Sequence, residues 1–394
     1  MKKFNLEIPD CKRFSGYKPC IPYKTCYEGC VQPDRPFGKK ILIINLDAMG
    51  DVLMTTAQLP PLKRKYPESY VAWITLKSAT PLLAGNPYID DVFSWDAESW
   101  LMLEQMEFDL ILNADKSRRS AALAMALDAK EKLGFGLNGN GQIIPLNKEA
   151  VYNFKLGLDD YLKFRINKRT GQDILAETFK LPYDHDEYVL QLSDEELALT
   201  RAYRESKGIK GDDLVIGFNT GCSDLYPNKK LTIDQHLRLI EMFSNESRLK
   251  MLLLGGREDT KRNKEIYDKA IEHAPGIVTR LFNTPADEGL RRGIVYENAA
   301  DVIITGDSYG MHLGIALKKQ VLVWFGVSCP EEIDLYGRGK KFIPVEDPVS
   351  GKGLFCSPCW KKVCPYDLEC IKMVDLEGIR SSALQKTATT KAAG

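Results

Sequence analysis

The sequence has no excess of either charge sign: Lys and Arg total 54, and Asp and Glu also total 54. A protein that binds mainly nucleic acid would carry a basic excess, so nucleic acid is not an expected partner. No apolar run reaches the ~18 residues that a membrane-spanning helix requires, so we expect at most peripheral membrane contact. Residues 1–10 lack the apolar core of a secretory signal, which predicts a cytoplasmic protein.

Short apolar runs alternate with helical patterns along most of the 394 residues. Residues 41–46 are typical of a strand buried on both faces, and a helical stretch covers residues 51–66 with a break at Pro60 and Pro61. Further strands are expected at residues 71–75, 91–95, 109–114, 214–219, 250–254, 301–305 and 320–325. Strands that alternate with helices pair in parallel. The sequence therefore predicts an α/β fold with two doubly wound, Rossmann-like domains, whose ligands bind at the carboxyl ends of the strands.

The composition changes along the chain and predicts five segments. They are a Cys-rich irregular appendage (residues 1–38), a first domain with a linker (39–190), a second domain (191–350), a Cys-rich segment with a C-terminal helix (351–380) and a disordered tail (381–394). The tail is assigned to disorder because it consists mainly of Ser, Thr, Ala and Lys.

The loop after the first predicted strand places Gly50 and Asp51 at the start of a helix. It lacks the G-x-G-x-x-G pattern of dinucleotide-binding folds, which argues against a nicotinamide enzyme. The helix dipole and free backbone N–H groups at this position favour the ionised form of Asp51. Such a carboxylate either caps the helix or takes a proton from an acceptor hydroxyl.

A second strand-to-helix junction lies at residues 307–312, Asp-Ser-Tyr-Gly-Met-His. Exposed N–H groups and the helix dipole stabilise an anion there, so the junction is a suitable seat for a diphosphate. An ordinary helix cap uses the same residue types, and His312 is equally compatible with a packed position inside the helix.

Two more polar loops follow predicted strands of the second half. Residues 219–222, Asn-Thr-Gly-Cys, precede the pair Lys229 and Lys230, and a lysine here can neutralise the charge on a departing diphosphate. Residues 255–259, Gly-Gly-Arg-Glu-Asp, place acids after another strand. Each of these signals is weak alone, because lysines and acids commonly form a solvated surface.

Cysteine is the one unusual count: ten are present, and eight lie in two groups near the ends. Without an export signal, metal ligation is favoured over a disulfide framework. Four thiolates within a short segment can close a structural zinc or iron site; reduced thiols or a local disulfide are the alternatives. The candidate ligands are Cys356, Cys359, Cys364 and Cys370 and, with less regular spacing, Cys11, Cys20, Cys26 and Cys30.

Taken together, these segments resemble glycosyltransferase family 9, the ADP-heptose:lipopolysaccharide heptosyltransferases, in the same order over residues 40–375. The matching segments are residues 41–44, 49–53, 55–56, 85–90, 307–312 and 325–326. The resemblance implies the GT-B architecture, in which two Rossmann-like domains face each other across a cleft. The cysteine-rich ends are additions to that pattern.

The resemblance also implies roles for individual residues. Asp51 occupies the position of the family's proposed general base, and Lys229, with Lys230 one register away, that of its donor-site lysine. Tyr309 and Gly310 depart from the family's usual glycine and proline, which leaves the shape of that loop open. The implied donor-site residues are Asn219, Thr220, Gly221, Lys229, Glu258 (preferred over Asp259 for the ribose hydroxyls), Asp307, Ser308, Gly310, Met311 and His312.

The implied activity is inverting transfer of heptose from ADP-heptose to a hydroxyl of a lipopolysaccharide core or related glycan, with no metal in the chemistry. Some protein-directed heptosyltransferases similar to this family carry an iron-binding cysteine finger, so a protein acceptor is a second hypothesis. A non-catalytic metal-binding assembly protein and a nucleotide-sugar epimerase are further alternatives on the same fold. The expected partners are a nucleotide sugar and a glycan, lipid-linked or protein acceptor, while the oligomeric state stays open.

Overall fold

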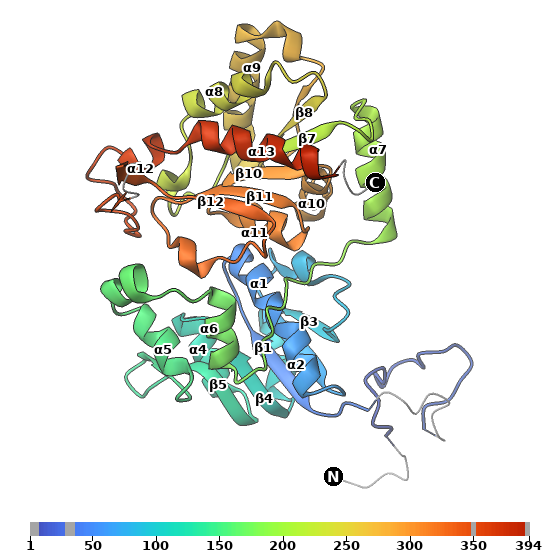
Figure 1. The fold of residues 1–394 in the computed structure, drawn as a ribbon. Coiled ribbons are helices and arrows are strands. Elements are labelled where there is room, and N and C mark those ends of the chain that lie inside the picture. The colour runs from blue at the N-terminus through green and yellow to red at the C-terminus, as the bar shows by residue number, and fades with distance from the viewer. Residues whose placement is uncertain (1–7, 28–35, 348–351, 391–394) are drawn as a thin grey trace. The chain divides into compact units, whose positions relative to one another are not determined.

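The structure, a computed structural model, describes residues 8–27, 36–347 and 352–390 (Figure 1). Its contacts divide the chain into two compact units. Unit 1 consists of Met1–Asp47, Ala57–Phe154 and Ile174–Asp186, and unit 2 consists of Ala48–Thr56, Lys155–Asp173 and Glu187–Gly394. The junction between Asp186 and Glu187 lies close to the predicted domain boundary at residue 190. Two shorter segments differ from the predicted division, because Ala48–Thr56 and Lys155–Asp173 belong to unit 2. The predicted general base Asp51 therefore lies in unit 2.

Unit 1 is built on a six-stranded sheet with the order β3-β2-β1-β4-β5-β6, in which β5 and β6 are antiparallel and the other pairs are parallel. The strands are β1 (Lys40–Ile44), β2 (Tyr70–Thr75), β3 (Asp91–Ser94), β4 (Phe108–Asn113), β5 (Ala129–Leu137) and β6 (Ile143–Pro145). The helices are α2 (Leu59–Lys65), α3 (Ala97–Glu104), α4 (Arg118–Ala126), α5 (Ala150–Leu156) and α6 (Gly171–Thr178), of which α5 and α6 cross unit boundaries.

The helical stretch predicted for residues 51–66 is interrupted, as its two prolines indicated. Helix α1 (Met49–Thr55) ends in a 3₁₀ turn (Thr56–Gln58), after which α2 begins. Pro60 and Pro61 stand in the first turn of α2, where the missing N–H groups would have had no partner inside the helix. The predicted break is confirmed.

Unit 2 repeats the same strand order, β9-β8-β7-β10-β11-β12, and all its pairs in this sheet are parallel. The strands are β7 (Leu214–Asn219), β8 (Leu249–Leu254), β9 (Leu281–Asn283), β10 (Val302–Gly306), β11 (Gln320–Trp324) and β12 (Gly339–Phe342); β13 (Val345–Asp347) and β14 (Lys352–Gly353) form a separate hairpin. The helices besides α1 are α7 (Asp194–Ser206), α8 (Ile233–Phe243), α9 (Thr260–His273), α10 (Leu290–Asn298), α11 (Tyr309–Ala316), α12 (Glu369–Lys372) and α13 (Leu376–Thr390), and residues Leu162–Ile166 form a π-helical turn. Both sheets thus have the order expected of a doubly wound Rossmann fold, and the predicted fold class is confirmed.

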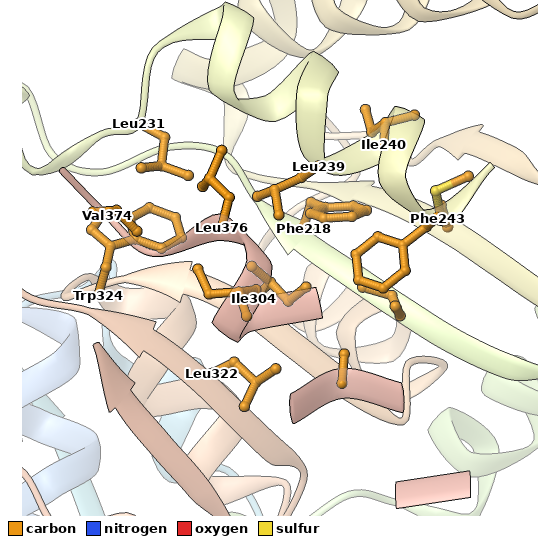
Figure 2. Packing of buried hydrophobic residues seen from close by; sticks show 14 of the residues in the cluster. Phe218, Leu231, Leu239, Ile240, Phe243, Ile304, Leu322, Trp324, Val374 and Leu376 are labelled. Carbon is orange, nitrogen blue, oxygen red and sulfur yellow. The ribbon is translucent and has the colours of Figure 1, made fainter. Parts of the chain in front are cut away.

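The core of unit 2 lies between one face of its sheet and helices α8 and α13 (Figure 2). Phe218 of β7 packs beside Phe243 of α8, with their ring centroids 6.1 Å apart. Helix α8 begins at a capping box, in which Thr232 and Gln235 satisfy each other's backbone N–H groups. A close-packed core of this kind fixes where the strands of the sheet end.

The C-terminal residues differ from the sequence prediction. Helix α13 continues to Thr390, so the tail predicted to be disordered from Ser381 is helical as far as that residue; residues 391–394 lie outside the described part. The helix forms because Ile379 and Ala383 are fully buried in the core of unit 2, and this tertiary packing outweighs the polar composition.

The predicted N-terminal appendage has no helix or strand in its described part, residues 8–27 and 36–38. Lys12 ties it to unit 1: its Nζ donates to the carbonyl oxygen of Ser69 over 2.7 Å and pairs with Asp90 over 3.2 Å. Among the described residues, no helix has both the length and the apolar character needed to cross a membrane.

Candidate active site

The order of the unit 2 sheet reverses between β7 and β10. In doubly wound sheets, ligands bind outside the carboxyl ends of the strands at such a reversal. The two strands are paired so that Asn219 lies opposite Thr305. Residues 219–221 follow β7, and residues 307–308 follow β10, so the fold brings two of the predicted donor-site loops together.

The side chain of Asn219 ties these two loops to each other. Its Nδ2 donates to Ser308 Oγ over 3.0 Å and to Thr305 Oγ1 over 3.3 Å. Gly310 leaves the space for this amide, because a Cβ at that position would lie 1.7 Å from Asn219 Nδ2. The departure from the family pattern at Gly310 therefore has a structural reason: this chain places an asparagine amide over the first turn of α11.

The first N–H groups of α11 lie at the same reversal point, between the ends of β7 and β10. Ser308 is the N-cap, but its side chain makes no capping hydrogen bond and is held by Asn219 instead. The first backbone N–H groups of a helix lack partners inside the helix, and together with the dipole they favour an anion. The hydroxyl of Tyr309, by contrast, is buried, and burial raises the pKa of Tyr309.

Lys229 reaches the reversal point from the loop between β7 and α8. Its Nζ donates to Asp307 Oδ2 over 2.7 Å, and both side chains are largely buried, with exposed fractions of 14% and 13%. Burial raises the pKa of Asp307, but the Lys229 ammonium, together with smaller contributions from His312 and Ser328, outweighs burial and holds the pKa of Asp307 below its usual value. Lys230 turns away and pairs with Asp224 over 3.5 Å, which favours Lys229 as the donor-site lysine.

Helix α1 packs against α11 and brings Asp51 toward this pair. Gly50 permits the close approach, because a Cβ there would lie 2.5 Å from His312 Cδ2. Asp51 is the third residue of α1, and its exposed carboxylate accepts a hydrogen bond from the N–H of Ala48 over 3.1 Å. The carboxylate thus both supports the start of the helix and remains accessible to a ligand.

His312 is buried beneath Gly50 and is held by a residue that sequence reasoning missed. Tyr188 Oη lies 3.1 Å from His312 Nδ1, and the two rings stack with centroids 6.0 Å apart. Burial lowers the pKa of His312, and the nearby Asp307 and Asp51 carboxylates oppose that shift only in part. No local motif marked Tyr188, because it lies in the irregular segment before α7.

The acid beside residues 219–221 is Asp259 rather than the predicted Glu258. A Cβ on Gly221 would lie 2.0 Å from Asp259 Oδ1, whereas Glu258 is exposed. Burial raises the pKa of Asp259, and its Oδ2 accepts a hydrogen bond from the N–H of Gly256 over 3.0 Å. The assignment of Glu258 to the ribose hydroxyls remains a prediction, with Asp259 directly beside it.

The side chains of two other predicted donor-site residues pack inside unit 2 and support the loops of the site. The Thr220 hydroxyl donates to Oδ1 of the buried Asn263, and Met311 is fully buried within α11. Their side chains therefore hold the loops in place, while the Lys229 ammonium and the N–H groups of α11 supply the groups that can bind an anion.

The C-terminal cysteines come together beside this site. Cys356, Cys359, Cys364 and Cys370 all line one cavity of about 270 Å³, together with residues that include Asn228 and Val327. Cys364 Sγ accepts hydrogen bonds from the N–H groups of Tyr366 over 3.3 Å and Leu368 over 3.4 Å. Burial raises the pKa of Cys370 to about 11. Among the described residues, no three or more His, Cys, Asp or Glu side chains are gathered closely enough to hold a metal ion.

The N-terminal cysteines are not brought together in this way. Cys11 is buried, Cys20 is exposed and Cys26 is half-buried, and no metal-binding group includes them. Cys30 lies outside the described residues.

Comparison with known proteins identifies the family. The model of glycosyltransferase family 9 (heptosyltransferase) matches residues 98–368. The chain belongs to glycosyltransferase family 9. It is therefore a glycosyltransferase, and the predicted enzyme class is confirmed.

Individual relatives of this family 9 chain support the same conclusion. It is 31% identical to the lipopolysaccharide core heptosyltransferase OpsX of Haemophilus influenzae over 105 residues, which cover 25% of this chain and only 30% of OpsX. With lipopolysaccharide heptosyltransferase 2 of Escherichia coli it shares 22% identity over 312 residues, covering 74% of this chain and 84% of the relative.

Solved structures share the fold of this family 9 chain. The E. coli ADP-heptose lipopolysaccharide heptosyltransferase II superposes with a TM-score of 0.62 at 18% identity, covering 88% of this chain and 99% of that one. The iron-containing dodecameric glycosyltransferase TibC of enterotoxigenic E. coli superposes with a TM-score of 0.50 at 12% identity, covering 89% and 76%. These likenesses confirm the two-domain architecture of the GT-B heptosyltransferases.

Proposed function

We propose that this protein transfers heptose from ADP-heptose to an acceptor hydroxyl of a lipopolysaccharide core or related glycan, with inversion at the anomeric carbon. The observation that carries the proposal is the site at the β7–β10 reversal. There α11, whose N-terminus follows Asp307 of the Lys229–Asp307 pair, packs against α1, the helix that carries Asp51. An anion seat and an accessible carboxylate are the two groups that such a transfer requires.

In this proposal, Lys229 and the N-terminal N–H groups of α11 bind the donor diphosphate. They stabilise the negative charge that develops on the diphosphate as the bond to the sugar breaks. Asp307 cannot serve the diphosphate directly, because an ionised carboxylate only accepts hydrogen bonds. Its role is to hold the Lys229 ammonium at the reversal point through the 2.7 Å contact.

Asp51 acts as the general base. Its carboxylate accepts the proton of the acceptor hydroxyl while that oxygen attacks the anomeric carbon from the face opposite the diphosphate. His312 supports this arrangement from below, because its buried ring packs under Gly50 and keeps the start of α1 in place. Glu258 or its neighbour Asp259 receives the ribose hydroxyls.

An anionic glycan acceptor is supported by the reversal point of the unit 1 sheet. Lys116, Arg118 and Arg119 are exposed at the carboxyl end of β4 and the start of α4. Guanidinium and ammonium groups bind carboxylates and phosphates well, so these side chains would suit an acceptor that carries such groups. The named relatives that act on lipopolysaccharide agree with this acceptor class.

The decisive variant is D51N, which keeps the shape of the side chain and removes its basicity. We expect transfer from ADP-heptose to a heptose-free lipopolysaccharide core to fall by about 10²–10⁴-fold, the usual contribution of a general base. Calorimetric binding of ADP should stay unchanged. The matched control is D194N, which removes an exposed aspartate from the first turn of another helix, α7, and this variant should retain transfer.

Retained transfer in D51N would refute the base assignment. Selective binding of ADP over other nucleoside diphosphates would support the donor, and its absence in folded protein would refute the nucleotide site altogether. Release of free sugar without an acceptor would favour the epimerase alternative.

A protein acceptor is the second candidate, and the cavity lined by the four C-terminal cysteines favours it. The solved structure of TibC is that of an iron-containing glycosyltransferase, and thiolates are ligands that iron and zinc accept, so a metal would draw the four sulfurs closer together than they lie in this structure. Two backbone N–H groups already point at Cys364 Sγ, as hydrogen bonds to ligating sulfurs do. A metal held by Cys356, Cys359, Cys364 and Cys370 would stabilise the segment and take no part in the transfer.

Elemental analysis of the full-length protein tests this site. About one zinc or iron per chain, lost in a C356S/C364S variant and kept in C222S, would support it. Metal-free protein whose four thiols all react with a thiol reagent would refute it. Transfer to a peptide or protein substrate, in place of the lipopolysaccharide core, would establish the second candidate.

A further inference from the structure

The segment that carries the four C-terminal cysteines also places an aromatic ring on Lys229. Trp360 follows Cys359 directly, and its ring centroid lies 4.6 Å from Lys229 Nζ. The same ring lies 4.9 Å from Lys163 Nζ, and it meets the ring of Tyr226 edge-on at 5.2 Å. Tyr226 in turn lies 5.6 Å from Lys229 Nζ. The ammonium group that we assign to the donor diphosphate is therefore bordered by two aromatic rings.

The backbone around Trp360 is fixed by several contacts within unit 2. The N–H groups of Cys359 and Trp360 both donate to the carbonyl oxygen of Val327 over 2.9 Å. Asn228, the neighbour of Lys229, donates from Nδ2 to the carbonyl oxygen of Lys361 over 2.6 Å. Arg165 donates to the carbonyl oxygens of Phe355 and Ser357, both over 3.0 Å.

Trp360 also has a φ of +50°, in the left-handed region that bulky side chains seldom adopt. A residue stays in such a conformation only when its surroundings over-determine it. The hydrogen bonds on either side of Trp360 supply that constraint. The backbone that carries the ring is consequently held in one conformation beside Lys229.

Two forces then act on the Lys229 ammonium. Asp307 attracts it from one side through the 2.7 Å ion pair, and the face of Trp360 attracts it through a cation–π interaction. The indole ring also displaces water, which strengthens the remaining electrostatic interactions of the ammonium group. A second lysine on the same ring, Lys163, is neutralised by Glu332 at 3.3 Å.

We propose that Trp360 is a positioning residue of the donor site: it holds the Lys229 ammonium for the donor diphosphate and makes the cysteine-rich segment one wall of that site. The inference rests on the proposed role of Lys229.

The experiment compares ADP with adenosine as calorimetric probes of the full-length protein and its variants. Adenosine lacks the diphosphate, so its binding should not depend on Lys229 or Trp360. W360L removes the aromatic face and should weaken ADP binding by between about threefold and thirtyfold, the range of a cation–π contact. W360F keeps a face and should recover most of that loss. V363A, at an exposed position of the same segment, is the matched control and should bind as wild type.

A double-mutant cycle with K229M tests whether Trp360 affects ADP binding through Lys229. When Lys229 is absent, W360L should cause no further loss of ADP affinity, because the two residues act through one contact. Wild-type ADP affinity in W360L, alongside a clear loss in K229M, would overturn the inference and leave the proposed donor site intact. Equal ADP affinity in wild type and K229M would overturn both. Loss of adenosine binding in W360L, with no recovery in W360F, would show a merely structural role and also overturn the inference.

Discussion

The two sheets share one strand order, yet the aspartates at their reversal points accept hydrogen bonds from different kinds of donor. In unit 1, the buried Asp115 follows β4 and accepts hydrogen bonds from the Asn45 side chain and the N–H of Leu46. In unit 2, Asp307 follows β10 and accepts its hydrogen bond from the Lys229 ammonium. The Asp115 carboxylate thus accepts hydrogen bonds from neutral N–H donors, whereas the Asp307 carboxylate holds an ammonium group in place.

This difference teaches that topology fixes where a ligand binds and that the loops fix which ligand is accepted. At the reversal point of unit 1, the buried Asp115 carboxylate accepts hydrogen bonds from the Asn45 amide and the N–H of Leu46, and the exposed Lys116, Arg118 and Arg119 follow it in the chain. The unit 2 crevice combines the Lys229 ammonium with the N-terminus of α11. A diphosphate is therefore expected in unit 2.

The largest expected effect comes from replacing the cation in unit 2. K229M should weaken ADP binding by about 10–100-fold, because it removes a hydrogen bond between charged groups. The matched change in unit 1 is K116M, which removes an ammonium that donates to the Asn153 carbonyl oxygen over 2.9 Å. K116M should leave ADP affinity unchanged in the same calorimetric titration.

K229M alone also leaves the Asp307 carboxylate buried without its partner, which destabilises the protein. The double variant K229M/D307N removes both charges and should regain thermal stability without regaining ADP affinity. Recovery of ADP binding in the double variant would show that Lys229 acts only through folding, and the contrast between the two crevices would lose its functional meaning.

A smaller effect on ADP affinity is expected from filling the space beside Gly310, in the first turn of α11. In G310A the new methyl group would meet Asn219 Nδ2 at 1.7 Å, so the amide must move away from Ser308. We expect unfolding to become easier by about 1–3 kcal/mol, as for other overpacked sites, and ADP affinity to fall because the loop after β10 shifts. Chemical denaturation and calorimetry measure the two changes.

The control in unit 1 is G136A, whose methyl group would approach Leu146 Cδ2 at 2.6 Å and Met125 Sδ at 2.7 Å. These are the ends of flexible side chains, so G136A should lower stability without a change in ADP affinity. Adding N219A to G310A should restore the space and part of the stability. Equal ADP affinity in G310A and wild type would contradict the assignment of this loop to the diphosphate.

The sequence predicted the parts of the fold that depend on local pattern. The apolar runs identified the central strands, including Ile41–Ile44, which are fully buried, and the prolines identified the end of α1. Asp51, Lys229 and residues 307–312, which the resemblance assigned to the active site, all lie in unit 2, although their roles remain proposals.

The remaining contacts join residues that lie far apart in sequence, and no local pattern encodes them. Trp360 meets Lys229 only because the cysteine-rich segment folds back on Val327, and Tyr188 meets His312 from an irregular segment. Similarly, the choice between Glu258 and Asp259 depends on which carboxylate a 3₁₀ turn directs toward Gly221. The C-terminal helix was predicted, but its continuation beyond residue 380 was missed because that part is stabilised by burial, including that of Ala383, rather than by composition.

The smallest effect in this comparison is expected from mild acid, which should act on unit 2 before unit 1. His236 is buried in α8, with Nδ1 3.0 Å from the carbonyl oxygen of Thr232 and the Arg262 guanidinium close by. Burial and the Arg262 charge lower the pKa of His236 to about 4. The one histidine of unit 1, His185, is exposed.

The unfolded chain protonates a histidine near pH 6.5, whereas folded unit 2 resists protonation of His236 until about pH 4. The stability that this difference provides is complete above pH 6.5 and is lost as the pH falls; between pH 7 and pH 5 the loss is about 2 kcal/mol. Buried His312 adds a loss in the same direction. Hydrogen exchange resolved by peptide should show that unit 2 loses protection first at pH 5, and H236Q should reduce its pH dependence. Earlier loss of protection in unit 1, or an unchanged pH dependence in H236Q, would mean that the acid sensitivity does not come from the buried histidines that distinguish the two units.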